Sequence, residues 1–168
     1  MKKGVLIFIA GITLLSFVLV GFMGSVPTGI VPVVYISSVQ VLDFNGNVPV
    51  VNPATQIKTI KINFYDKDKY TPFEYKGANY IAYFFQTAVL PDNATDRTFQ
   101  YSVGDNPYVI IDPENEQASY KGLFFIKELE QASIDAGITK FKTHIYCNAK
   151  DGGNAPEDDV LFTITYIK

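Results

Sequence analysis

The chain of 168 residues has no Trp, one Cys and one His. So few sulfur and imidazole side chains leave few ligands for a zinc, haem or iron–sulfur centre. A single Cys also excludes the internal disulfide of antibody-type immunoglobulin domains. The sequence contains no Gly-x-Ser-x-Gly, His-Glu-x-x-His, Walker or glycine-rich phosphate motif. We therefore expect a protein that is not an enzyme and carries no cofactor, with a bound calcium ion as the one exception considered below.

Positive charge is also sparse. Lys and Arg number 14 against 17 Asp and Glu, which gives a formal net charge of −3, and Arg97 is the single Arg. No basic cluster beyond the first three residues is longer than two residues. Nucleic-acid binding needs clustered cations that neutralise phosphates. The sequence therefore predicts no nucleic-acid partner.

One long apolar run stands out. Residues 4–23 contain no charged side chain, and twenty residues at a helical rise of about 1.5 Å span about 30 Å, the thickness of a bilayer's hydrocarbon core. Lys2 and Lys3 precede the run, and positive residues beside a membrane span stay on the cytoplasmic side. We expect residues 1–24 to contact a membrane through residues 4–23 and to bring the rest of the chain to an extracytoplasmic position.

Three interpretations of this segment stay open. A cleaved signal peptide is the first, although its apolar run exceeds the ~7–15 residues usual for such signals, and Phe22 and Met23 crowd the cleavage position near Gly24. An uncleaved membrane anchor is the second, and it needs no cleavage site. The third comes from a resemblance carried by the first residues of the chain.

Lys2-Lys3-Gly4 leads directly into Val5-Leu6-Ile7-Phe8-Ile9. This junction resembles the processing site of type IV pilin-like and archaellin-like precursors. In that family a peptidase cuts after the small residue, and the apolar segment becomes the helix that packs the filament core. Bacterial members carry a Glu near the start of the mature chain, whereas archaeal members often lack it. Residues 4–23 hold no Glu, so the resemblance, which covers about twenty residues, points to an archaeal rather than a bacterial type.

Beyond a Pro- and Gly-containing connector over residues 25–32, the sequence is typical of a β protein. We expect one extracytoplasmic domain over residues 33–168, formed as an antiparallel β-sandwich of immunoglobulin-like or jelly-roll type with one short helix. A helix is predicted over residues 120–136, because Leu123, Ile126 and Leu129 follow a 3.6-residue period and Gly137 is a suitable end. Strands are predicted over residues 33–44, 57–65, 79–90, 98–103, 108–112, 139–147 and 160–167, the last two as an antiparallel pair.

Few residues are candidates for chemistry. His144 and Cys147 are three positions apart on a predicted strand, so they face opposite sides and cannot form a catalytic dyad. We expect Cys147 in the core and His144 on the surface. Asn93-Ala94-Thr95 fits the acceptor pattern for N-glycosylation at Asn93. The polar loop over residues 148–159 offers oxygen ligands suited to calcium, although it matches no EF-hand spacing. The four candidate ligands are Asp151, Glu157, Asp158 and Asp159.

Adjacent aromatic residues are candidates for an interface. Side chains next to each other on a strand point to opposite faces, so pairs such as Phe84-Phe85 supply one ring to the core and one to the other side. An exposed side would mark a contact surface. The six residues concerned are Tyr80, Tyr83, Phe84, Phe85, Phe124 and Phe125.

Two functions remain. The first is a structural or assembly protein of the cell envelope or surface, as a pilin-like filament subunit or a membrane-anchored surface subunit that contacts copies of itself or envelope proteins. In one version the extended segment 30–44 would insert into a neighbour's sheet. The alternative is an anchored or secreted binding module that recognises a glycan, a peptide or a cation through its loops.

Overall fold

The computed structural model describes residues 31–167, and Val33–Lys168 forms one compact unit. The predictions for the apolar segment 1–24 and for most of the connector 25–32 therefore lie outside the described residues. Within residues 31–167, no helix has the length and apolar character needed to cross a membrane.

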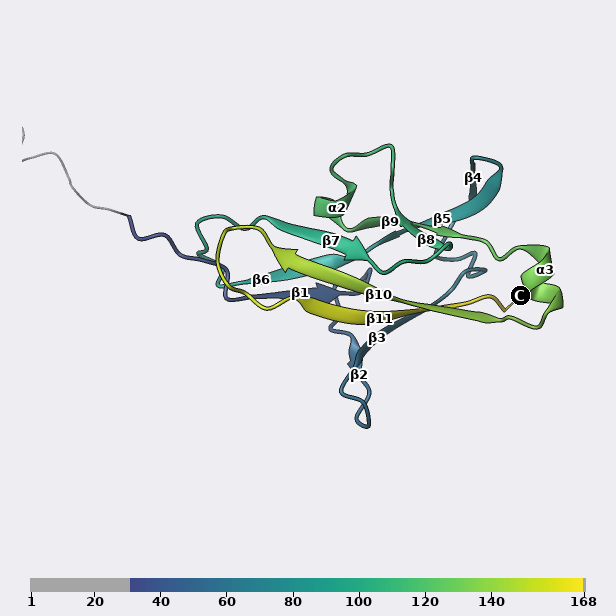
Figure 1. Cartoon of the computed structure of the whole chain (residues 1–168), viewed down its shortest axis with the longest axis horizontal. Coiled ribbons are helices and arrows are strands. Elements are labelled where there is room, and N and C mark those ends of the chain that lie inside the picture. Colours follow the sequence, from purple (N-terminus) through teal and green to yellow (C-terminus); the bar gives the residue numbers. More distant parts are fainter. Residues whose placement is uncertain (1–30, 168) are drawn as a thin grey trace, which may run out of the picture. The chain divides into compact units, whose positions relative to one another are not determined.

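The described residues are mainly β (Figure 1). Each of the seven predicted strand regions contains a strand. The strands are β1 (Ser38–Leu42), β2 (Val50–Val51), β3 (Lys58–Asn63), β4 (Phe73–Tyr75), β5 (Ala78–Phe84), β6 (Gln86–Leu90), β7 (Phe99–Val103), β8 (Val109–Ile111), β9 (Leu123–Lys127), β10 (Lys140–Ala149) and β11 (Asp158–Thr165). Two short helices, α2 (Ala118–Lys121) and α3 (Gln131–Asp135), complete these elements.

The largest sheet has the strand order β2-β3-β11-β10-β7. The predicted antiparallel pair is confirmed, since β10 and β11 pair from Lys140 opposite Thr165 to Cys147 opposite Asp158. On its other side β11 pairs with β3 in parallel. This neighbour comes from a part of the chain about a hundred residues earlier, so the centre of the sheet depends on long-range pairing.

The remaining strands form a four-stranded sheet, β4-β5-β9-β8, and the pair β1-β6. Only Phe85 separates β5 from β6, and its N–H donates a hydrogen bond to the carbonyl of Gly122 at 2.9 Å. The predicted strand 79–90 is therefore one extended run that pairs first with β9 and then with β1. Within the segment 30–44, β1 pairs with β6 of its own chain and buries Val39 and Val41, so insertion into a neighbour would require β1 to leave β6.

Aromatic rings join the sheets across the core. The ring of Phe162 in β11 lies 5.2 Å from that of Tyr83 and 5.0 Å from that of Phe85. Phe85 also meets Phe124 of β9 edge-on at 5.1 Å. All four side chains are buried, and each fully buried ring of this size stabilises a fold by about 1.5–3 kcal/mol. This arrangement is compatible with a β-sandwich.

The predicted helix over residues 120–136 is wrong. Its first two residues end α2, and Leu123–Lys127 form strand β9, in which Phe124 and Ile126 are buried while Phe125 between them is only half-buried. The run Leu-Phe-Phe-Ile satisfies a helical period and a strand alternation equally well. Pairing with β5 on one side and β8 on the other decides for the strand, because tertiary context overrides local propensity.

A shorter helix, α3, occupies the end of that region, and Gly137 ends it as predicted. Gly137 has φ +77° and donates to the carbonyl of Ile134 at 2.9 Å, while Ile138 donates to that of Ser133 at 3.0 Å. These two bonds form a Schellman motif, in which a left-handed residue after the helix satisfies its last carbonyls.

Among the described glycines, we expect replacement of Gly122 to destabilise the fold most. Gly122 has φ +68°, and a Cβ added there would overlap the carbonyl oxygen of Phe85 and lie 2.9 Å from Cε2 of Tyr101. We expect Gly122→Ala to lower the free energy of unfolding by about 3 kcal/mol, because left-handed strain adds to overlap with a fixed backbone. Gly137→Ala, at a similar φ but with no atom within 4 Å of the new Cβ, should cost about 1 kcal/mol. Urea unfolding of both variants measures the difference, and equal losses would show that the contact with Phe85 is unimportant.

Candidate interaction surfaces

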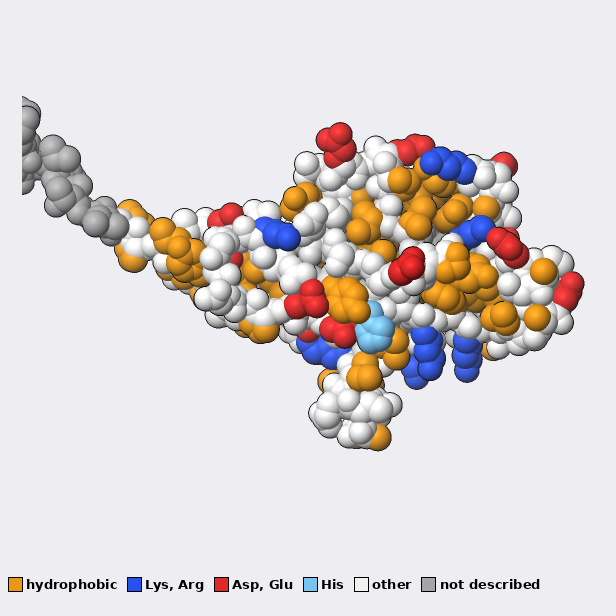
Figure 2. Space-filling view, viewed as in Figure 1, with side chains coloured by type: hydrophobic (Ala, Val, Ile, Leu, Met, Phe, Trp, Pro, Cys, Tyr) orange, Lys and Arg blue, Asp and Glu red, His pale blue; other side chains and the backbone are white. Residues whose placement is uncertain are grey.

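The one potential nucleophile pair is separated by the sheet, as predicted. Cys147 is fully buried in the core and forms no disulfide. His144 lies on the opposite face of β10, where its Nδ1 is 2.7 Å from Oδ1 of Asp159 and its ring stacks on Tyr146 at 5.9 Å. Figure 2 shows this single His on the surface. Imidazole and thiol therefore cannot act on one substrate.

The four carboxylates proposed for calcium point in different directions. Asp158 faces inward and Asp159 outward on β11. Asp151 accepts hydrogen bonds from the backbone N–H groups of Ile36 and Gly153, and Glu157 accepts one from the side chain of Asn148. Among the described residues, no group of three or more His, Cys, Asp or Glu side chains is placed to hold a metal ion. The calcium site therefore stays a prediction from the sequence alone.

Asp158 joins strand β1 to the five-stranded sheet. Its carboxylate is about nine-tenths buried, forms an ion pair with Lys58 of β3, and accepts a hydrogen bond from the N–H of Val41 in β1 at 2.7 Å. Charge-assisted hydrogen bonds of this kind are stronger than neutral ones. The side chain that was predicted as a cation ligand is thus a structural link between β1 and the five-stranded sheet.

Asn93, the predicted glycosylation site, is exposed in the loop after β6. Thr95, the third residue of the acceptor pattern, donates its N–H to the carbonyl of Val34 at 2.8 Å, and its Oγ1 accepts from the N–H of Val34 at 2.9 Å. The loop is therefore held against the segment that precedes β1, with the amide of Asn93 on the surface. Glycosylation of Asn93 stays a prediction.

The six aromatic residues divide between two faces. Tyr83, Phe85 and Phe124 are buried in the core, each 2% exposed or less, whereas Phe84 is 42% exposed. Tyr80 and Phe125 lie outward with Phe84, on the side of the four-stranded sheet that turns away from the core.

Two further rings complete a surface that we call the aromatic face, formed by Phe73, Tyr75, Tyr80 and Phe125. Phe73 and Phe125 meet edge-on at 4.9 Å, and Tyr75 lies 5.7 Å from Tyr80 and 5.8 Å from Phe125. Each of the four side chains is half-buried. Figure 2 shows hydrophobic side chains gathered at the upper right of the body, where Figure 1 places β4 and β5. Contiguous apolar surface of this kind is typical of interaction sites.

A second surface lies on the outer side of the five-stranded sheet. Lys142, Thr163 and Lys61 are direct neighbours across β10, β11 and β3, so the two lysine Cα atoms are about 10 Å apart at a strand spacing of about 4.8 Å. Lys140 lies two positions along β10. All three lysines are exposed, and none forms an ion pair with any residue in the part of the chain that the structure describes.

These lysines line a groove of about 930 Å³, which we call the lysine groove. Its other wall is the arm, residues 48–57, which contains β2 and projects from the body in Figure 1. Val48, Val50 and Val51 of the arm are 59%, 76% and 43% exposed. The groove therefore combines cationic and apolar groups.

The sequence predicts the strands that carry Lys61, Lys140 and Lys142 but does not predict the lysine groove. Lys61 lies about eighty residues away from them, and only the parallel pairing of β3 with β11 brings it into the same row. A strand alternation predicts which face a lysine occupies, but it does not predict which strands are neighbours.

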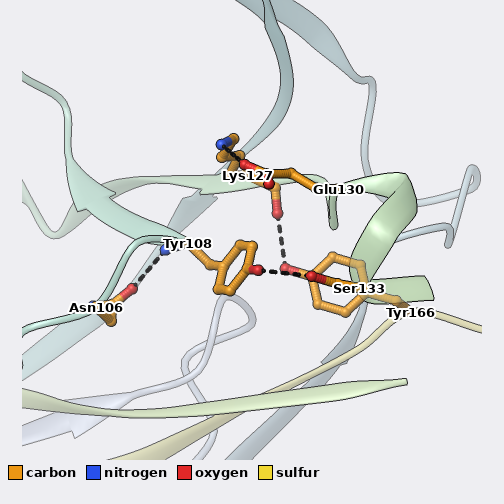
Figure 3. A network of polar contacts seen from close by, with 6 residues as sticks. All are labelled: Asn106, Tyr108, Lys127, Glu130, Ser133 and Tyr166. Carbon is orange, nitrogen blue, oxygen red and sulfur yellow. Dashed lines mark hydrogen bonds and ion pairs between the residues drawn. The ribbon is translucent and has the colours of Figure 1, made fainter. Parts of the chain in front are cut away.

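A dense cluster of polar contacts around α3 serves the fold. Tyr108 and Ser133 lie 3.3 Å apart through their hydroxyls, and the hydroxyl of Tyr166 donates to the carbonyl of Lys127 at 2.8 Å (Figure 3). Lys127 pairs with Glu130 at 2.8 Å. Burial is the largest cause that raises the pKa of Tyr166, so this phenol stays a neutral donor. We assign these contacts to fixing α3 against β8 and β9.

Cys147 should be protected from thiol reagents in the native state. Burial raises the pKa of its thiol to about 12, from 9.0, so almost no thiolate exists at pH 8. We expect no labelling by a disulfide reagent at pH 8 within the dead time of mixing, and full labelling in urea. Ser102→Cys, at an exposed position of the neighbouring β7, provides a reactive control. Rapid native labelling of Cys147 would show that the core is open at this strand.

Asp158 and Asp159 should differ sharply in their contribution to stability. Asp158→Ala removes the partner of Lys58 and the acceptor for Val41, and we expect it to lower the free energy of unfolding by about 3 kcal/mol. Asp159→Ala breaks only an exposed contact with His144 and should cost less than about 1 kcal/mol. The measurement is urea unfolding at pH 7, and similar losses in both variants would contradict the structural role of Asp158.

Comparisons with protein-family models, curated proteins and solved structures find no match to this chain.

Proposed function

We propose that this protein is a structural or assembly subunit of the cell envelope or cell surface, without enzymatic activity. Its apolar residues 4–23 hold the chain in a membrane or in a filament core, and the domain 33–168 is displayed outside. We further propose that this domain is a β-sandwich of immunoglobulin-like or jelly-roll type. The ring contacts of Phe162 with Tyr83 and Phe85 support this assignment, because they join two sheets by their apolar faces.

The observation that carries the proposal is the aromatic face. Four rings contact one another on the side of a sheet where no other element of the described chain buries them fully. Aromatic residues are enriched in protein–protein interfaces, where they supply a large apolar area with little loss of side-chain entropy. A subunit that contacts copies of itself or envelope proteins has a use for such a surface, whereas a solitary domain does not.

Other exposed apolar side chains support the same function. Val33 and Tyr35, at the beginning of the domain, are 58% and 52% exposed. Val50, on the arm, is 76% exposed. These side chains would add apolar area to contacts with neighbours in an assembly.

The pilin-like form is the most specific version of this proposal. Processing between Gly4 and Val5 would leave residues 5–23 as an uncharged helix at the start of the mature chain. Such a helix would pack with its copies in a filament core, as the resemblance implies. The membrane-anchored form keeps the same orientation and the same displayed domain, with Met1 retained.

A second candidate function is an anchored or secreted binding module, and the lysine groove is the observation that favours it. Besides its lysines, the groove is lined by Asp43, Asn45, Asn47 and Thr59. Amide, hydroxyl and ammonium groups of this kind hydrogen-bond the hydroxyl and carboxylate groups of glycans and peptides. In this function the groove, rather than the aromatic face, would carry the recognition.

The mature N-terminus tests the proposed function. We expect protein isolated from its native cell surface to begin at Val5 in the pilin-like form or at Met1 in the anchored form. Mass spectrometry of the N-terminal peptide distinguishes the two, and electron microscopy of the same material should show filaments or surface arrays. In the pilin-like form, Gly4→Leu should abolish processing, because the peptidase of that family requires a small residue before the cut. Thr28→Leu, in the connector, is the control that leaves the processing site unchanged.

A mature chain that begins near residue 25 and occurs as discrete single particles would contradict the assembly function. It would favour the secreted binding module instead.

A further inference from the structure

We propose that copies of this chain associate head to tail, with the lysine groove and arm of one copy seated on the aromatic face and acidic loop of the next. The acidic loop is residues 112–116, between β8 and α2, which contain Asp112, Glu114 and Glu116. This proposal rests on the proposed function and assigns the surfaces that would carry out the assembly.

Charge is the first argument. Residues 31–167 contain 11 Lys and Arg and 17 Asp and Glu, a formal charge of −6, so two copies repel each other at long range. Association therefore needs local complementarity. The lysine groove offers three cations without a carboxylate partner among the described residues.

The acidic loop is a matching anionic site. Glu114 and Glu116 are exposed, and no described cation forms an ion pair with either of them. The acidic loop begins directly after β8, and Ile110 of β8 is paired with Phe125 of the aromatic face. The acidic loop therefore borders the sheet that carries the aromatic face.

The apolar groups match in the same way. The exposed valines of the arm lie next to the three lysines, and the rings of the aromatic face lie next to the acidic loop. Each surface thus combines one apolar and one charged area, with opposite signs of charge. Burial of aliphatic groups against aromatic rings supplies affinity, and the charges select the partner and its orientation.

The two surfaces lie on opposite sides of the domain. Figure 1 shows β2 and the arm at the lower side of the body and the loop between β8 and α2 at the upper side. In Figure 2, lysine side chains lie along the lower side next to the arm, and acidic side chains lie at the upper side. A twofold pair would place lysine against lysine, which is unfavourable. A contact between two different surfaces instead repeats from copy to copy and produces a chain of subunits or a ring.

Charge reversal in the full chain tests this proposal. The variants are Lys61→Glu with Lys142→Glu in the groove, and Glu114→Lys with Glu116→Lys in the loop. Each pair is purified from membranes in a neutral detergent, and self-association is measured by analytical ultracentrifugation at 0.1 and 1 M NaCl. We expect the unaltered chain to associate about tenfold more weakly in 1 M salt, where the screening length falls to about 3 Å. Each double variant alone should lose about a hundredfold in affinity.

Mixing the two double variants should restore association, because the reversed groove then meets the reversed loop and the two unaltered surfaces also pair. Lys67→Glu with Lys150→Glu is the control, since it makes the same change in net charge at exposed lysines outside the groove. The apolar N-terminal segment is identical in all variants, so its contribution cancels.

The proposal is overturned if the mixture fails to associate, or if the control weakens association as much as the groove variant does. It is also overturned if the chain stays monomeric while the groove binds polygalacturonate, a carboxylate-bearing glycan. If the chain assembles equally well in every charge-reversal variant, the proposed interface is wrong, while the proposed assembly function still stands. The absence of any assembly by the unaltered chain would remove both.

Discussion

The contact on which the rest of the structure depends is the packing of Phe162 against Tyr83 and Phe85. It joins the central strand of the five-stranded sheet to the long run formed by β5 and β6. Once these faces are buried, strand alternation assigns every neighbouring side chain to the core or to the outside. Lys61 faces outward because Ile60 and Ile62 face inward, and Phe125 faces outward because Phe124 faces inward. Both candidate surfaces are therefore consequences of how the core is packed.

Asp158 shows how polar groups complete a joint that apolar packing alone does not fix. The N–H of Val41 and the ammonium of Lys58 both reach its carboxylate, so β1 is held in one register against β3 and β11. Hydrophobic contact is non-directional, whereas a buried carboxylate with two donors accepts one geometry. The position of Asp158 at the edge of the core thus gives this carboxylate a structural role.

The sequence allowed the strands to be predicted more reliably than their partners. The strands predicted over residues 57–65 and 139–147 are present, and Cys147 lies in the core as predicted, because a half-buried strand repeats every two residues. The helix over 120–136 failed where an apolar run satisfied two periods at once. The lysine groove could not be predicted, and of the aromatic face only Tyr80 and Phe125 were, since each surface combines residues from three strands or more whose neighbours are set by long-range pairing. Gly137, by contrast, was predicted correctly, because a helix end is a local feature.

The same separation of inside from outside makes the surfaces of this domain independent of its stability. Lys61, Lys142, Glu114 and Glu116 are exposed and form no ion pair within the described residues, and changes at such positions usually alter the stability of a fold by less than about 0.5 kcal/mol. The core therefore does not constrain the sign of their charge. The cations gathered on one side of this acidic domain are therefore not needed for folding. They reduce the electrostatic repulsion between two copies only where an anionic surface lies against them. A partner surface with the opposite arrangement removes that repulsion where the two surfaces touch, and the chain itself carries such a surface in its acidic loop.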